Sequence, residues 1–342
     1  MSEPNTAIPK GSLVVITGVT GHVASELTRQ FLSRGYKVRG TVRDLAKASW
    51  LVDDVFKSYA DKGALELVAV PDISAEGVFD DVVKGAAAVL NVASIVSFDP
   101  NPHNVITPVV AATSSILKAA AKEPSVKRFV QTGSIVATTM LVPGNTTHIT
   151  KDTWNETAVE MAWAPPPYDA SRAFPTYMAS KVAAEKEVWR FIAEEKPHFA
   201  VNVVTPQTII GKRLSPFCTS FSATIVPSLY EGKMDTFQIL PAMFGVNVKD
   251  VALLHLAAAL DPDVTGERIH AWGQHCTWNE ALGLMRKLFP NHKFIDDFSD
   301  ASYSLTTDLT IPLALLKKWG NQDGWIPLEQ SFLDNMDHVP RE

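Results

Sequence analysis

The chain has 342 residues, of which 46% are hydrophobic and 20% are charged, a balance typical of a folded protein with a substantial core. Its formal net charge of -6 excludes the basic surface expected of a nucleic-acid or anionic-membrane binder. We find no apolar run near the ~20 residues of a membrane span and no signal-peptide core. We therefore predict a cytoplasmic protein in which Cys218 and Cys276 are free, buried thiols.

Short apolar runs alternate with helical patterns through the first part of the chain. Helical patterns follow Gly21 up to Gly35, begin again at Asp44, and cover residues 114–121. Strands are predicted at residues 13–16, 36–42, 65–70, 87–92, 129–132 and 201–204. This alternation predicts an α/β fold, a Rossmann-type doubly wound parallel sheet.

The pattern changes after Pro206, where glycine, proline, serine and aromatic residues show weaker periodicity. Thr277 and Glu280 have the spacing of a capping box, and a later helix is expected to run from about Pro312 to Gly320. We predict a main domain over residues 1–206 and a smaller, mostly helical lobe over residues 207–342, with possible exchange of chain between them.

A glycine-rich turn links the first predicted strand to its helix. Gly18 permits the turn, Gly21 allows close approach of a pyrophosphate, and Ala24 allows tight packing of helix on strand. The helix N-terminus would then offer N–H groups to the phosphates. The alternative is a strand-turn-helix without a ligand. The residues expected to bind the dinucleotide here are Thr17, Gly18, Thr20, Gly21, His22 and Val23.

The second strand ends at Arg43, and Lys47 follows one turn later. A guanidinium suits a phosphate dianion, so this end favours NADPH over NADH. Asp44 could instead reach a ribose, but we interpret it as a helix cap. Topology alone places further residues at the carboxyl edge of the sheet, beside the cofactor, although each could be an ordinary loop residue: Asp72, Ile73, Ala93, Ser94, Pro206 and Thr208.

Tyr177 and Lys181 lie four residues apart, so on a helix they share one face. A nearby ammonium favours the phenolate and lowers the tyrosine pKa, which suits proton exchange with a carbonyl or alcohol oxygen. Ser134 follows the fifth predicted strand, at the edge where ligands bind. Its hydroxyl could hydrogen-bond the same substrate oxygen.

With these residues the chain resembles the extended short-chain dehydrogenases/reductases. The matching positions are Thr17-Gly-x-x-Gly-x-x-Ala24, Ser134 and Tyr177-x-x-x-Lys181. Segment 35–43 adds a likeness to dihydroflavonol reductases and to yeast or fungal NADPH-dependent aldehyde/ketone reductases. The resemblance implies that Tyr177 is the general acid, that Lys181 binds the nicotinamide ribose and lowers the tyrosine pKa, and that Ser134 orients the carbonyl. Gly133 departs from the family, which often has a second serine there.

The substrate pocket is expected to be apolar, which suits a hydrophobic or aryl ketone. Core packing is the alternative for each candidate, and the segment from Phe237 to Phe244 could form a lid. No histidine spacing typical of a metal site is present. The candidate pocket residues are Ser97, Phe98, Ile135, Phe174, Gln207, Phe237, Met243 and Phe244.

The leading hypothesis is NADPH-dependent reduction of aldehydes, ketones or keto esters by a monomer or homodimer. A flavonoid- or steroid-type dehydrogenase is barely separable from it. A nucleotide-sugar epimerase or dehydratase would need basic residues in the C-terminal lobe to hold a diphosphate, and arginine is sparse there. A non-catalytic NADP-binding regulator would have no need of the tyrosine-lysine pair.

Overall fold

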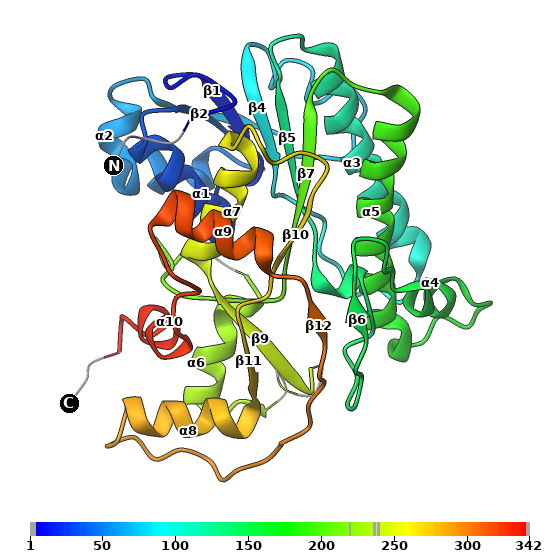
Figure 1. The fold of residues 1–342 in the computed structure, drawn as a ribbon, viewed down its shortest axis with the longest axis vertical. Coiled ribbons are helices and arrows are strands. Elements are labelled where there is room, and N and C mark those ends of the chain that lie inside the picture. The colour runs from blue at the N-terminus through cyan, green and yellow to red at the C-terminus, as the bar shows by residue number, and fades with distance from the viewer. Residues whose placement is uncertain (1–4, 219, 235–236, 238–239, 340–342) are drawn as a thin grey trace.

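In the computed structural model, described for residues 5–218, 220–234, 237 and 240–339, seven parallel strands form the central sheet. Their order is β10-β7-β5-β4-β1-β2-β3, and Figure 1 shows helices on both sides of this sheet. The order reverses between β1 and β4, as expected of a doubly wound fold. The predicted fold class is therefore confirmed. The strands of this sheet are β1 (Leu13–Ile16), β2 (Lys37–Val42), β3 (Leu65–Ala69), β4 (Ala86–Asn91), β5 (Arg128–Thr132), β7 (Ala200–Pro206) and β10 (Arg268–Ala271).

Two apolar layers hold the helices against the sheet. One face packs on α1 and α7 and includes Leu27, Phe31 and Leu254, and the other packs on α3 and α5 and includes Ile116 and Phe191. Because both faces are covered, the central strands β1 and β4 are apolar along almost their whole length. The helices of this part are α1 (His22–Ser33), α2 (Lys57–Ala60), α3 (Pro102–Lys122), α4 (Glu156–Trp163), α5 (Ala173–Glu195), α7 (Val248–Leu260) and α9 (Thr310–Gly320).

The second lobe contains a sheet as well as helices, which the sequence did not predict. Strands β8 (Thr208–Ile210), β9 (Ala242–Asn247) and β11 (Gln274–Thr277) form a three-stranded sheet in the order β11-β9-β8. This sheet lies in the lower part of Figure 1 with α6 (Ile225–Tyr230), α8 (Trp278–Leu288) and α10 (Leu328–Asn335). A third, two-stranded sheet pairs β6 (His148–Ile149) with β12 (Thr306–Thr307).

The chain crosses back into the main sheet after residue 206. Helix α7 packs on α1, and β10 pairs with β7 as the edge strand. The prediction of six strands missed β10, because its sequence Arg268-Ile-His-Ala271 carries a charged and a polar side chain. The domain boundary at 206 thus remains a prediction, and residues 248–271 lie with the first lobe.

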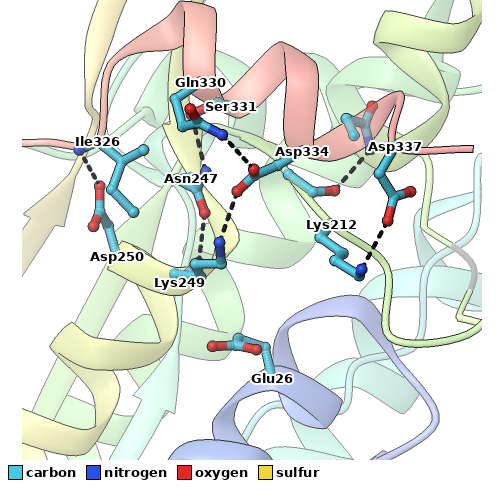
Figure 2. A network of polar contacts seen from close by, with 12 residues as sticks. Glu26, Lys212, Asn247, Lys249, Asp250, Ile326, Gln330, Ser331, Asp334 and Asp337 are labelled. Atoms are coloured by element: carbon cyan, nitrogen blue, oxygen red, sulfur yellow. Dashed lines mark hydrogen bonds and ion pairs between the residues drawn. The ribbon is translucent and has the colours of Figure 1, made fainter. Parts of the chain in front are cut away.

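Polar contacts bind the C-terminal helix to the junction between the lobes (Figure 2). Lys249 pairs with Asp334 at 2.8 Å and Lys212 pairs with Asp337 at 2.9 Å. The amide of Asn335 donates to the Gly211 carbonyl oxygen at 2.8 Å. Helix α10 therefore fixes the segment that leaves β8.

Two local predictions need correction. The helix expected from Asp44 to Tyr59 is broken into a 3-10 turn, a π turn and α2, and the helix expected at 114–121 is the end of the longer α3. Helix α3 also has the length and composition of a membrane span, with 21 residues and a hydropathy of 1.2. The apolar part of α3 is 56% buried inside the fold, and the core helix of a folded domain has the same length and composition.

Candidate active site

A cleft of about 750 Å3 runs along the carboxyl ends of the central strands and continues against the second lobe. This is the edge at which open α/β sheets bind ligands. Its lining includes both the glycine-rich turn and the predicted catalytic residues. The predicted residues that line this cleft are Gly18, Thr20, Gly21, His22, Val23, Arg43, Asp72, Ile73, Ala93, Ser94, Phe98, Ser134, Ile135, Phe174, Tyr177, Lys181, Pro206, Gln207 and Thr208.

The glycine-rich turn has the geometry of an anion-binding loop. Gly18 has a φ of +69°, and a Cβ there would lie 3.0 Å from the Ala93 Cβ. Gly21 caps α1 and has no side chain to bond the first N–H groups of the helix. The N-terminus of a twelve-residue helix is therefore open toward the cleft, as a pyrophosphate requires.

His22 connects this turn to the second lobe. Its Nε2 lies 3.3 Å from the Lys212 carbonyl oxygen, and its buried Nδ1 has no hydrogen-bond partner among the residues that the structure describes. Burial lowers the His22 pKa to about 4. The ring is therefore neutral at pH 7, and the carbonyl acceptor assigns its proton to Nε2.

The end of β2 presents Arg43, which is exposed and lines the cleft. Asp44 turns its carboxylate to its own backbone and accepts from the N–H groups of Ala46 at 2.9 Å and Lys47 at 3.2 Å. These bonds support a local capping role for Asp44 at the 3-10 turn Ala46–Ala48, although Leu45 holds the N-cap position of that turn and the longer helix expected after Asp44 is broken. Arg43 is the cationic side chain that this strand end offers to a ligand.

Ser134, Tyr177 and Lys181 all line the same cleft. Ser134 begins the turn after β5, and its Oγ accepts from the Val136 N–H at 3.4 Å. The Tyr177 ring packs between Phe98 and Phe174, with centroids 5.2 Å and 6.1 Å away. Helix α5 thus carries the phenol and the ammonium on one face, beside the end of β5.

The pKa values of this pair differ from the prediction. Burial raises the Tyr177 pKa to about 12 and lowers the Lys181 pKa to about 8. The Lys181 ammonium donates to the Ser94 hydroxyl at 2.9 Å and lies 5.6 Å from the centre of the Tyr177 ring. The expected lowering of the tyrosine pKa is therefore absent here, because desolvation of the phenolate dominates.

Gly133 lies where the packing is tight. A Cβ at this position would lie 3.0 Å from methyl groups of Thr205 and Val203 and 3.3 Å from Oε2 of Glu185. A second serine, common in the resembling family, would press on β7 and α5 and require these neighbours to shift. The tight packing is consistent with glycine at residue 133 of this chain.

Six predicted site residues lie outside the cleft lining. Thr17 is fully buried, and its hydroxyl accepts from the N–H groups of Val92 and Ala93, so it holds β1 to β4. Lys47 is exposed on the turn after β2. Ser97 lies in the loop after β4, where its hydroxyl accepts from the Asp99 N–H at 3.2 Å.

The other three belong to the second lobe. Phe237 packs on Trp278 at 4.8 Å, while Met243 and Phe244 lie in β9, which is buried along its whole length. Met243 and Phe244 are core residues because both faces of β9 are covered. The lid expected over 237–244 also includes Gln238 and Ile239, which lie outside the described residues.

Sequence reasoning missed most of the apolar wall. These side chains come from segments without clear periodicity. The one signal in the sequence is that several aromatic and aliphatic residues occur in segments predicted as loops, where they could line a binding site. The additional residues that line the cleft are mostly apolar: Ile95, Val96, Val136, Leu141, Phe217, Ser220, Phe221, Ser222, Ile225 and Leu240.

Comparison with known proteins identifies the family. Residues 14–270 match the model of the NAD dependent epimerase/dehydratase family. This chain belongs to that family. It is an extended short-chain dehydrogenase/reductase, as its motifs indicated.

Two relatives in this family match this chain over nearly their whole length. An NAD-dependent epimerase/dehydratase of Aspergillus terreus is 39% identical, covering 97% of this chain and 98% of the relative. Aldehyde reductase 2 of Sporidiobolus salmonicolor is 36% identical, covering 96% of each. The structure of Gre2 from Candida albicans in complex with NADPH has a TM-score of 0.78 at 25% identity, covering 96% of this chain and 98% of that one.

Proposed function

We propose that this protein reduces aldehydes, ketones or keto esters to alcohols with NADPH, using Tyr177 as the general acid. One observation carries the proposal. A single cleft is lined both by the turn from Gly18 to Gly21 and by Ser134, Tyr177 and Lys181, so a dinucleotide and a carbonyl compound would share one space. The relatives named for aldehyde and ketone reduction support it.

The residues present fit NADPH. The open N-terminus of α1 and the close approach of Gly18 to Ala93 suit a pyrophosphate. Arg43 would bind the 2′-phosphate through paired N–H groups, because Asp44 is engaged as a cap. The Lys181 ammonium would give up its hydrogen bond to Ser94 and donate to the ribose hydroxyls instead. When bound, the cofactor supplies the hydride.

Two residues of the chain would then bind and protonate the substrate oxygen. Ser134 donates to the carbonyl oxygen and holds it beside Tyr177. Because its pKa is about 12, Tyr177 stays protonated at pH 7 and has a proton to give. The oxygen gains negative charge as the reaction proceeds, so these two donors stabilise the transition state more than the ground state.

The cleft lining argues against a nucleotide-sugar substrate. Such a substrate carries a diphosphate that needs basic partners, yet the lining residues from 206 to 240 include no lysine or arginine. Lys212 pairs with Asp337 and Lys233 pairs with Glu231. The apolar wall suits a hydrophobic carbonyl compound instead.

The test is NADPH oxidation with an activated aryl ketone, comparing the wild type with Tyr177→Phe. The variant keeps the ring that packs on Phe98 and Phe174 and loses only the hydroxyl. We expect kcat to fall by at least about 100-fold with little change in NADPH affinity, measured by fluorescence titration. Equal rates for the two proteins would remove Tyr177 from the mechanism.

A further inference from the structure

Three hydrogen bonds hold the side-chain amide of Gln207 in one orientation. Its Oε1 accepts from the Phe244 N–H and from the Thr208 hydroxyl, and its Nε2 donates to the Tyr303 hydroxyl at 2.7 Å. A backbone N–H can only donate, so the oxygen of the amide must face Phe244. The Tyr303 hydroxyl donates onward to the Ala242 carbonyl oxygen at 2.8 Å, which leaves its lone pairs to accept from Gln207.

This arrangement leaves one N–H of the amide for a ligand. An amide nitrogen carries two hydrogens, and the bond to Tyr303 is the one that Nε2 makes within the described part of the chain. Gln207 is partly exposed and lines the cleft. Tyr303, by contrast, is 2% exposed and cannot rotate away freely. The cleft therefore contains a donor whose position is set in advance.

Strand pairing places this donor next to the reacting centre. In the β5–β7 pair, Thr132 lies opposite Val204, and the Gly133 N–H donates to the Val204 carbonyl oxygen at 2.8 Å. Ser134 and Gln207 thus leave the ends of two adjacent strands. Around them the wall is apolar, with Ile135 and Leu141 among its residues.

We propose that Gln207 binds a second acceptor oxygen of the substrate, so that keto esters and diketones are preferred over simple ketones. This inference rests on the proposed carbonyl reduction and assigns Gln207 to specificity. A fixed polar donor in an apolar wall discriminates strongly, because a substrate without the matching oxygen leaves it unpaired. Tyr303 is then a positioning residue, acting through Gln207.

The experiment compares two substrates of matched size, a β-keto ester and the simple ketone in which CH2–CH2 replaces the CO–O group of the ester, so that no second acceptor oxygen remains. The readout is the ratio of their kcat/KM values with NADPH. We expect Gln207→Met, which keeps the length, and Gln207→Glu, which replaces the donor by an acceptor, each to lower the ratio by about tenfold. Tyr303→Phe should lower it by a smaller factor, because the amide keeps its hydrogen bonds to Phe244 and Thr208 and loses only the one to Tyr303.

Gln330→Met is the matched control. Gln330 is exposed on α10 and donates to Asp334, so the ratio should not change. A ratio within twofold of wild type in both Gln207 variants, with NADPH binding retained, would overturn the inference. Failure of the proposed function is distinguishable, since the wild type would then reduce neither substrate.

Discussion

Glu185 and Arg268 form an ion pair in which both side chains are 1% exposed, with Nε 2.6 Å from Oε1. Nη2 also donates to Oε2 at 3.1 Å, and Nη1 donates to the Thr153 carbonyl oxygen at 2.7 Å. The pair joins α5 to β10. Glu185 lies one turn beyond Lys181 on α5, so the pair fixes the helix that carries the proposed catalytic residues Tyr177 and Lys181.

Breaking this pair from one side should strongly destabilise the fold. Glu185→Leu leaves a buried guanidinium without its carboxylate, and we expect the free energy of unfolding to fall by about 3–5 kcal/mol. The double variant Glu185→Leu/Arg268→Met removes both charges and should recover most of this loss. Urea unfolding measures both, and a double variant no more stable than the single one would contradict the expectation.

Gly133→Ser should be destabilising, although serine is common there in the family. The new Cβ would press on Thr205, Val203 and Glu185, and overpacking of this kind costs about 1–3 kcal/mol. Gly283→Ser is the control, because a Cβ at that helical position meets nothing within 4 Å and should slightly stabilise α8. Thermal unfolding compares the two, and equal midpoints would show that residue 133 has room.

Arg43→Ala should lower the affinity for NADPH much more than the affinity for NADH. Loss of charged hydrogen bonds to a phosphate is expected to weaken NADPH binding by about 10- to 100-fold, while NADH binding changes little. Lys47→Ala, outside the cleft lining, is the matched control and should change NADPH affinity by less than about threefold. Should both cofactors lose affinity equally in Arg43→Ala, the phosphate assignment is wrong.

The rate of carbonyl reduction should decline as the pH rises through about 8. Lys181 has a pKa of about 8, so it loses its charge there, whereas Tyr177, with a pKa of about 12, stays protonated. A pH profile of kcat/KM should thus show one inflection near 8. Lys181→Arg retains the charge at all these pH values and should remove that inflection; an unchanged profile would assign it to another group.

Acid should destabilise the protein in a window set by buried histidines. Burial lowers the His255 pKa from 6.5 to about 4, so between these values the unfolded chain binds more protons and stability falls as the pH falls. The window runs from about 6.5 down to 4, and the contribution of His255 is up to about 3 kcal/mol.

His255→Gln should weaken this dependence, because glutamine can bond Thr132, the present partner of Nε2 at 2.8 Å, without titrating. Urea unfolding at pH 7 and pH 5 measures the difference. Since His22 and His270 are shifted in the same direction, part of the dependence should remain. A variant with the full wild-type dependence would exclude His255 as a source.

The sequence by itself determined the α/β fold, the turn after β1 and the shared helical face of Tyr177 and Lys181. Each depends on spacing within one element and its neighbouring turn, and such spacing is visible in the residue pattern. The pattern also indicated Arg43 at the end of β2, because a parallel strand delivers its last residues to the ligand edge.

Tertiary structure alone decided the features that join distant segments. Strand β10 enters the main sheet despite its polar residues, because pairing with β7 and the ion pair to Glu185 satisfy them. Met243 and Phe244 are core because β9 is covered on both faces. Whether an apolar side chain faces a cleft or a core depends on which segments pack over it, and that is settled only when the whole chain has folded.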